Sequence, residues 1–419
     1  MSIFTKKKAY DFSIYGFGQL INLASPLIVI PFLITTCGEE GLGKIGVGFS
    51  MALILNAIID YGSYIIGVRE IAIHRENPTV LNEKINAIYG SKFILLIFVL
   101  TLFSLLIFIV PFFSREKEMF FLSLVIVVGQ CFNPAWFFQG IENFKWISFI
   151  NILSKTIYLA GVFFFINKES DFIYVNLFFG LGLLISSLIG FFWLIHSFKF
   201  KITLSNLKKG KTIIKEEFSF SVSQFFLSIH QYFPIVIVSY VLGDFAAGQY
   251  RIIDQLLSLF KTYLNMIFYF VYANICHELN KSLQGGLKVW KQYNGLNFLL
   301  LFVVSLVFFF NSDYIVSFFN IDSNEIAPVS FLLKIGLLIP FLISLSQPLR
   351  QLIFAFSENR FYVRVTIYST LLNVVLMLIF SYFYGLIGTL YSILFVEFIV
   401  LILYSFILKD RFNSQSTIS

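Results

Sequence analysis

Charged residues are scarce in this chain. Only 13% of its 419 residues are charged, against about 25% in soluble domains. By contrast, 58% are hydrophobic and 55 are phenylalanine. A soluble fold of this length could not bury so much apolar surface. The composition therefore excludes a soluble protein and predicts an all-α integral membrane protein, because bundled helices satisfy their own backbone hydrogen bonds in lipid.

Residues that hold metals or form disulfides are also few. The three cysteines, Cys37, Cys131 and Cys276, stand far apart without a C-x-x-C spacing or a Cys/His cluster. We therefore expect neither a metal site nor a disulfide. The sequence also lacks an H-E-x-x-H motif, a nucleophile elbow and a phosphate-binding glycine loop. These absences predict a protein that is not an enzyme, that needs no cofactor, and that draws any transport energy from ion or substrate gradients.

Long apolar runs make up most of the chain, each close to the roughly 20 residues that a helix needs to cross a bilayer. The predicted spans are 11–36, 43–67, 87–112, 119–138, 147–166, 172–196, 217–242, 246–272, 293–311, 326–348, 362–383 and 386–408. The last two are separated only by a tight turn at Tyr384-Gly385. The first run is too long for a cleaved signal peptide, so we expect a retained first helix.

Basic residues are distributed unevenly between the two sets of loops. Five of the 30 lysines and arginines lie within spans, and four lie in one set of loops, at Lys44, Arg115, Lys117 and Lys168. All the others lie in the set that includes both chain ends. Positive loops stay in the cytoplasm, so both termini are predicted to be cytoplasmic and the number of spans even. The net charge of +7 mostly reflects this bias and gives no reason to expect a nucleic-acid partner.

The longest basic connection follows the sixth span and divides the chain into six plus six spans. We expect an N-terminal lobe at 1–200, a basic cytoplasmic linker at 201–216 and a C-terminal lobe at 217–419. Two like-oriented six-helix lobes around a central cavity are a known transporter plan, with the substrate site between the halves. The predicted fold is therefore about 12 transmembrane helices in two such lobes.

A weak internal repeat supports this division. The first span of each half carries a proline in an apolar stretch, at Pro26 and at Pro234. Each of these spans ends in a turn of the form Gly-acid-x-x-x-Gly, at 38–43 and at 243–248. We expect both turns to lie on the outer side of the membrane.

A polar stripe follows one face of the span at 246–272. Its members recur every three or four residues, which places them on one helical face: Arg251, Asp254, Gln255, Ser258, Lys261, Thr262, Asn265 and Tyr269. Lipid cannot accept such a face cheaply, so it must lie against protein or a watery cavity. Shorter stripes follow the first and seventh spans, at Tyr15, Gln19, Asn22 and Ser25 and at Ser221, Gln224, Ser228 and Gln231. Matching stripes are what two lobes need to line a shared cavity.

Ionisable residues inside the spans are candidates for function. The cations of interest are Lys155, Arg251, Lys261 and Lys334. The carboxylates are Asp60, Asp254 and Glu397. An excess of cations favours an anionic substrate, and Arg and Lys are the usual partners of phosphate.

Each candidate has a structural alternative. Arg251 and Asp254 are three residues apart and can pair with each other. Lys155, Lys334 and above all Lys92 can extend their ammonium groups towards the interface. Glu397 can be a proton-sensitive carboxylate or the buried partner of a lysine, and the Ser and Gln stripes can join helices to one another. Basic clusters outside the spans can set topology and contact anionic lipid headgroups, or take part in the first capture of a diphosphate.

Several motifs resemble those of the O-antigen (Wzx-type) flippases of the polysaccharide transporter family, in the multidrug, oligosaccharidyl-lipid and polysaccharide exporter superfamily. The stretches that carry the resemblance are 26–31, 60–62, 67–72, 133–140, 150–151 with Lys155, and 248–250. The most specific is Trp136-Phe137-Phe138-Gln139-Gly140, after the fourth span. The agreement is clearest over residues 1–160, whereas the C-terminal third offers little beyond hydropathy.

The resemblance implies a two-lobed, multi-pass protein of the bacterial inner membrane. It implies that the protein moves an undecaprenyl-diphosphate-linked oligosaccharide from the cytoplasmic to the periplasmic leaflet by alternating access, with proton or sodium coupling as a further expectation. Membrane lipids, a polysaccharide polymerase and a chain-length regulator are the other expected partners. The alternatives are a drug or cation antiporter of the same fold and, less favoured, a polysaccharide polymerase or ligase.

In the flippase interpretation each group of candidate residues receives a role. The diphosphate would bind to Lys155, Arg251, Lys261 and Lys334. Charge balance or ion coupling would fall to Asp60, Asp254 and Glu397. Helix bending would occur at Pro26, Pro31 and Pro234.

Overall fold

The computed structural model describes residues 6–198, 204–356 and 358–416. Within these ranges the chain consists of helices and short turns without a β-strand, which confirms the predicted all-α class. The first residues of the predicted linker, 201–203, lie outside them. The chain forms two compact units, Met1–Val236 and Ile237–Ser419. The lobe boundaries expected at residues 200 and 217 remain a prediction.

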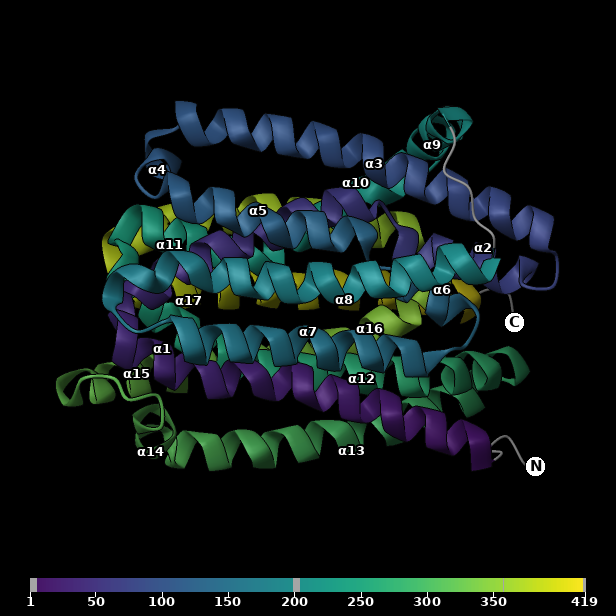
Figure 1. Cartoon of the computed structure of the whole chain (residues 1–419). Helices are drawn as coiled ribbons and strands as arrows, with labels where there is room; N and C mark the ends of the chain where they lie inside the picture. Colours follow the sequence, from purple (N-terminus) through teal and green to yellow (C-terminus); the bar gives the residue numbers. More distant parts are fainter. Residues whose placement is uncertain (1–5, 199–203, 357, 417–419) are drawn as a thin grey trace. The chain divides into compact units, whose positions relative to one another are not determined.

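The first unit is a bundle of long helices with short helices at its turns. Its elements are α1 (Lys6–Asp60), η1 (Ser63–Gly67), α2 (Val68–His74), α3 (Pro78–Ile109), α4 (Pro111–Ser114), α5 (Lys117–Phe132), α6 (Ala135–Gly140), α7 (Phe144–Phe165), η2 (Glu169–Tyr174), α8 (Val175–Phe198), α9 (Leu204–Glu216) and α10 (Phe218–Tyr232). Helix α8 packs between α5 and α7, α7 packs on α1, and α9 packs on α3 (Figure 1).

The second unit is built around one long helix. Its elements are α12 (Asp244–Lys281), α13 (Leu283–Phe310), α14 (Ser312–Ser317), α15 (Ser323–Gly336), α16 (Leu338–Ala355) and α17 (Asn359–Ser416). Helix α12 packs against α13 and α16, and α16 packs against α17. Helix α11 (Pro234–Leu242) contains the boundary at which one unit gives way to the other.

Helix starts follow local capping chemistry. Asn77 precedes α3, and its side chain accepts a hydrogen bond from the Val80 amide at 3.3 Å, with Pro78 at the first helical position. Ser282 plays the same part for α13 by accepting from the Gly285 amide at 3.1 Å. In both cases a short polar side chain satisfies an amide that the helix itself leaves unpaired.

The spanning helices agree with the hydropathy pattern. The described residues contain nine helices that are long and apolar enough to cross a membrane, together with one bent pair. Two of the long helices hold a glycine with non-helical backbone, at Gly38 in α1 and Gly385 in α17. Both glycines lie where the sequence separates two predicted spans. Dividing α1 and α17 at these glycines is consistent with the twelve predicted spans.

The turn that ends the first span recurs in the second unit with nearly the same backbone conformation. Gly38 has φ 72° and ψ 173°, and Gly243, before α12, has φ 91° and ψ 170°. This conformation is open to glycine and essentially closed to other residues. A Cβ atom at either position would meet nothing within 4 Å, so the backbone conformation and not the packing requires glycine. The shared conformation supports the internal repeat inferred from the sequence.

We therefore expect Gly38→Ala and Gly243→Ala each to destabilise the protein by roughly 1–3 kcal/mol through backbone strain. Gly295 provides the matched control, because it lies inside α13 and a Cβ atom there also meets nothing within 4 Å. Gly295→Ala should stabilise the protein by about 0.5–1 kcal/mol. Thermal unfolding of the detergent-solubilised variants measures the difference, and shifts of the same sign at all three positions would contradict the assignment.

Proline affects the spans unequally. Helices α10 and α11 meet at an angle of 47° at Phe233, directly before Pro234, which confirms the bend predicted there. Helix α1 continues through Pro26 and Pro31.

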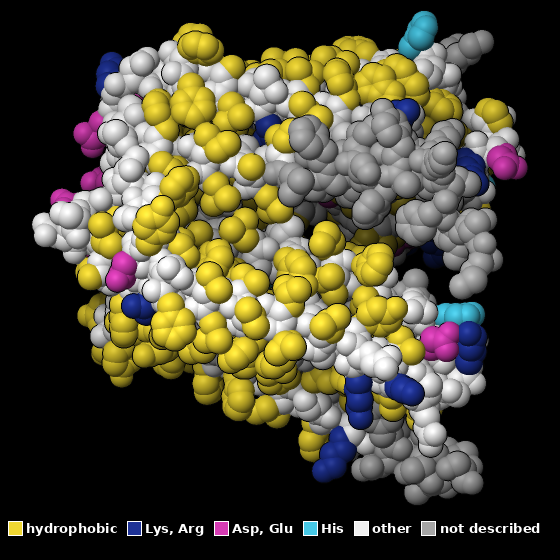
Figure 2. Space-filling view, turned by 90° about the horizontal axis from the view of Figure 1, so that it is seen from below, with side chains coloured by type: hydrophobic (Ala, Val, Ile, Leu, Met, Phe, Trp, Pro, Cys, Tyr) yellow, Lys and Arg dark blue, Asp and Glu magenta, His cyan; other side chains and the backbone are white. Residues whose placement is uncertain are grey.

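Hydrophobic side chains cover much of the surface in Figure 2, and charged side chains gather mainly towards its edges. Exposed aromatic residues such as Phe164 and Phe310 suit a surface that faces lipid.

Candidate functional site

Three of the predicted site residues form one cluster on α12. Asp254 Oδ1 accepts a hydrogen bond from Lys261 Nζ at 3.3 Å, and Asp254 Oδ2 lies 3.7 Å from Arg251 Nη1. Each of the three side chains is partly exposed, between 18% and 29%. One carboxylate therefore serves two cations, and the cluster has a positive excess. The ion pair between Arg251 and Asp254, which the sequence offered as an alternative, is therefore present, and Lys261 shares the same carboxylate.

Towards its C-terminal end, the polar stripe of α12 continues into contacts with neighbouring helices. The side-chain amides of Gln347 on α16 and Asn265 are hydrogen-bonded to each other at 2.8 Å. Gln351 Nε2, one turn further on, donates to the Phe268 carbonyl at 3.3 Å and Gln351 Oε1 accepts from Asn294 Nδ2 of α13 at 3.0 Å. In this part of the stripe, the polar side chains join α12, α13 and α16 to one another, as interhelical hydrogen bonds do in membranes.

Arg350 is a further cation within the second unit. It lies on α16, with its guanidinium carbon 4.7 Å from the centre of the Phe268 ring. Its Nε is buried and has no hydrogen-bond partner among the described residues. The sequence places Arg350 in a loop after the tenth span, whereas α16 continues to Ala355. The spacing of Gln347, Arg350 and Gln351 is the signal that would have placed it on a helical face.

Lys334 and Glu397 occupy other parts of the second unit. Lys334 lies on α15 with its ammonium 5.8 Å from the Phe309 ring of α13. Two residues along, a Cβ atom on Gly336 would lie 3.2–3.3 Å from Leu257 and Ile253, on the apolar face of α12. Lys334 is therefore directed towards α13 and not towards the Asp254 cluster. Glu397 lies half-buried on α17.

In the first unit, Asp60 belongs to a buried polar network. Its Oδ1 accepts from Lys92 Nζ at 3.0 Å and its Oδ2 accepts from Gln130 Nε2 at 2.9 Å. Gln130 Nε2 also donates to the Tyr64 hydroxyl at 3.2 Å, and Gln130 Oε1 accepts from Asn133 Nδ2 at 3.3 Å. Lys92 has no exposed side-chain surface, so it does not extend towards the interface as the sequence suggested. The Asp60 carboxylate balances the positive charge of the Lys92 ammonium inside the bundle.

This network lies where two spanning helices break. Immediately after Asp60 the backbone turns through Tyr61 (φ 40°) and Gly62 (φ 78°) into the π-helix η1. After Gln130, α5 ends at Phe132, and Asn133 Oδ1 accepts from the Ala135 amide at the start of α6. The Asp60 network thus ties together α1, α3 and α5 at the points where α1 and α5 stop.

Two of the motifs that carried the family resemblance pack against each other here. Trp136, Phe137 and Phe138 are fully buried. A Cβ atom on Gly67 would lie 3.1 Å from the Trp136 ring, and one on Gly140 would lie 2.7 Å from the Ile71 side chain. The motif at residues 136–140 therefore has a structural role, because its side chains and Gly140 pack α6 against α2.

Lys155 lies on α7, where it contacts aromatic rings. Its ammonium is 4.0 Å from the centre of the Phe179 ring on α8 and 5.9 Å from that of Tyr158. The attraction between a cation and an aromatic face stabilises a charge in such a position. The predicted convergence of Lys155 with the cations of α12 remains a prediction. The polar stripe of the first span is described only from Asn22 onwards, so the side chains of Tyr15 and Gln19 lie outside the described ones.

A surface ion pair joins the short helix α2 to α3. Glu70 Oε2 lies 2.8 Å from Lys84 Nζ, and both side chains are partly exposed. The hydrogen bond from Lys84 lowers the pKa of Glu70 below its ordinary value. The Glu70 carboxylate therefore forms an ion pair that joins α2 to α3.

Comparison with known proteins places this geometry in context. The family model described as "Polysaccharide biosynthesis protein" matches residues 9–272, well over half of the chain. The chain is 23% identical to a "Putative O-antigen transporter" of Escherichia coli K12, over 90% of this chain and 91% of that protein. It is 22% identical to a protein of the same name from Shigella dysenteriae, over 91% and 95% of the two chains.

Solved structures share the fold. An inward-facing multidrug resistance MATE transporter of the MOP superfamily superposes with a TM-score of 0.68 at 15% identity, covering 98% of this chain and 99% of that one. The lipid II flippase MurJ, in an inward closed conformation, superposes with a TM-score of 0.58 at 15% identity, covering 94% and 87%. These likenesses support a multi-pass membrane transporter fold. Together with the family match they confirm the resemblance inferred from the sequence, and the chain belongs to the polysaccharide biosynthesis protein family.

Proposed function

We propose that this protein is a flippase for a lipid-linked oligosaccharide. Its substrate would be an O-antigen repeat unit on undecaprenyl diphosphate, moved from the cytoplasmic to the periplasmic leaflet by alternating access. Family membership and the names of both curated relatives support the O-antigen pathway. The observation that carries the substrate class is the positive excess of the Asp254 cluster on α12.

The Asp254 cluster has the chemistry of a diphosphate anchor. Arg251 offers a planar fork of donors and Lys261 a compact ammonium, which are the two side chains that bind phosphate oxygens in proteins. Asp254 reduces the cost of keeping both cations within a span. When a diphosphate binds, its oxygens can replace the carboxylate as the partner of Lys261. While no substrate is bound, Asp254 acts as the counter-ion of Arg251 and Lys261.

The charge of the cluster also bears on the antiporter alternative. The likeness to the MATE transporter concerns the fold alone and leaves the substrate open. A cavity for organic cations would be expected to present an excess of carboxylates, whereas α12 presents the reverse. In the first unit the carboxylate of Asp60 is already engaged by Lys92. We therefore assign Asp60 and Asp254 to charge balance and leave ion coupling to Glu397.

The proposed topology follows from the loop charges. Both termini would lie in the cytoplasm and the protein would lie in the bacterial inner membrane. A polysaccharide polymerase and a chain-length regulator remain the expected protein partners, because they would act on the exported repeat unit.

Deletion of the gene in its own host tests the function. A flippase deletion should remove exported repeat units from the cell surface and cause the lipid-linked oligosaccharide to accumulate in the inner membrane. Re-expression of the chain should reverse both effects. Single, unpolymerised units on the surface would instead identify a polymerase. Drug resistance on expression, with unchanged surface polysaccharide, would identify an antiporter.

A further inference from the structure

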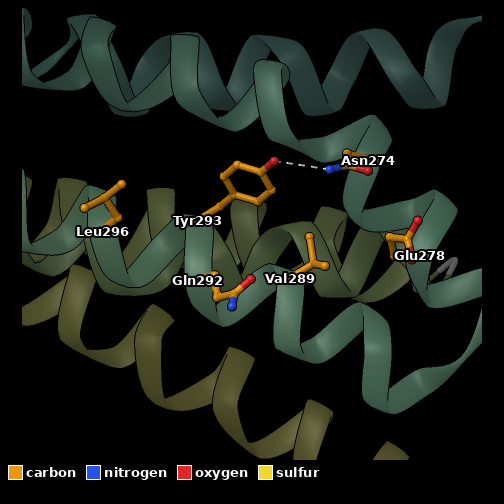
Figure 3. Close-up of a pocket in the computed structure, with 6 residues that line it drawn as sticks. All are labelled: Asn274, Glu278, Val289, Gln292, Tyr293 and Leu296. Atoms are coloured by element: carbon orange, nitrogen blue, oxygen red, sulfur yellow. Dashed lines mark hydrogen bonds between the residues drawn. The ribbon is translucent and has the colours of Figure 1, made fainter. Parts of the chain in front are cut away.

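An open groove lies between α12 and α13 near one end of both helices. Its volume is about 440 Å³, and its lining comprises Asn274, Glu278, Val289, Gln292, Tyr293 and Leu296 (Figure 3). Ligand pockets commonly have volumes of about 300–1,000 Å³, so the groove is large enough for a small organic group. All six residues belong to the second unit.

The groove differs chemically from the Asp254 cluster. Two amides, a carboxylate and a phenol surround two aliphatic side chains, and there is no lysine or arginine among the described residues that line the groove. Asn274 Nδ2 donates to the Tyr293 hydroxyl at 3.4 Å, which ties α12 to α13 across the groove (Figure 3). The carboxylate of Glu278 already accepts a hydrogen bond from Lys281 Nζ at 2.7 Å. The lining therefore does not favour phosphate as a ligand.

This combination suits a sugar ring. Amide groups donate to and accept from neighbouring hydroxyls, and a carboxylate accepts from them. The Tyr293 ring, 41% exposed, and the side chains of Val289 and Leu296 provide apolar surface for the C–H faces of a pyranose. A lipid acyl chain would contact the aliphatic side chains but would form no hydrogen bond with the amides, the carboxylate or the phenol.

The place of the groove along α12 suits a group that stays in water. With 38 residues, α12 is about 57 Å long at 1.5 Å per residue, well beyond the roughly 30 Å of a hydrocarbon core. The groove lies in the last turns of α12, beside Lys281, Lys288 and Trp290, and such residues mark the membrane interface. Thirteen residues separate Lys261 from Asn274, so the groove is about 20 Å along the helix from the cation cluster.

We propose that this groove binds a sugar of the lipid-linked oligosaccharide at the cytoplasmic interface, before the diphosphate reaches the α12 cations. The inference rests on the proposed function and on the topology predicted from the loop charges. It assigns recognition of the glycan and of the diphosphate to two separate places on the same helix.

Binding of a free glycan tests the groove directly. The probe is the repeat-unit oligosaccharide released from the host's own surface polysaccharide, and saturation-transfer NMR measures its binding to the full-length protein in nanodiscs. Tyr293→Ala removes the ring, and Val289→Trp fills the groove without removing a polar group. Each should weaken binding about tenfold, the effect of losing roughly 1.4 kcal/mol of contact. Tyr314→Ala, at an 81% exposed tyrosine on α14, is the matched control and should bind as the wild type does.

The outcomes distinguish a failure of the groove inference from a failure of the proposed function. If the wild-type chain restores surface polysaccharide but all four proteins bind the oligosaccharide equally, the groove inference is wrong and the proposed function stands. If the wild type fails to restore polysaccharide, the proposed function is wrong, and the binding experiment still decides whether the groove holds sugar. The absence of an oligosaccharide signal for the wild type, or a signal that neither Tyr293→Ala nor Val289→Trp weakens, would overturn the inference.

Discussion

Export of surface polysaccharide should fall in steps as the charge of the Asp254 cluster is lowered. The cluster has two cations and one carboxylate, so its formal charge is +1. Arg251→Ala or Lys261→Ala makes it neutral, and the double variant leaves Asp254 alone with a charge of −1. A hydrogen bond to a charged group contributes about 1.5–3 kcal/mol. We therefore expect each single variant to reduce export roughly 10- to 100-fold and the double variant to abolish it.

A compensating change separates charge from packing. Arg251→Ala combined with Asp254→Asn restores the +1 charge through Lys261 and should recover part of the export that Arg251→Ala loses. Arg360→Ala removes an exposed arginine at the start of α17 and should leave export unchanged. The measurement is surface polysaccharide per cell at matched amounts of protein in the membrane. Equal export by Arg251→Ala and by its combination with Asp254→Asn would contradict a role for the cluster's charge.

The second large effect is expected at the Asp60–Lys92 pair, and it concerns stability. Lys92 is completely buried, so Asp60→Asn leaves an ammonium without a counter-charge in the interior of the first unit. Removing one partner of a buried ion pair typically costs about 3–5 kcal/mol. Lys92→Met should cost less, because the Asp60 side chain is 20% exposed and keeps its hydrogen bond from Gln130.

Removing both charges of this pair should cost less than removing either one. Apolar replacement of a whole buried pair is often neutral or stabilising, so Asp60→Asn with Lys92→Met should recover much of the loss. Lys84→Met is the control, because it breaks the exposed pair with Glu70 and should cost about 0–1 kcal/mol. Thermal unfolding of the purified variants in one detergent compares them. A double variant as unstable as the sum of its singles would show that the two residues do not depend on each other.

The spans and turns could be predicted from the sequence because their signals are local. An apolar run identifies a span wherever the helix then packs. Gly38 and Gly385 marked turns because their positive φ angles favour glycine regardless of their neighbours. The cluster of Arg251, Asp254 and Lys261 could be predicted for the same reason, since all three lie on one face of one helix.

The pairing of Lys92 could not be predicted in this way. Its partner is 32 residues away on another span, and their meeting depends on how α1 and α3 pack. Arg350 was missed because α16 ends seven residues later than the apolar pattern suggests, at Ala355 and not at Pro348. Which cation donates a hydrogen bond to Asp254 depends on side-chain rotamers, about which a spacing of three or seven residues carries no information.

The bend before Pro234 has a mechanical consequence. The chain passes from one compact unit to the other within α11, whose nine residues include no ionisable acid or base apart from the phenol of Tyr240. Pro234 has no amide hydrogen, so the preceding turn is one backbone bond short and bends more easily than a regular helix. A change of pH can therefore reach this bend only from outside α11, as through Asp244 in the first turn of α12, whose carboxylate accepts a hydrogen bond from Ser239 Oγ.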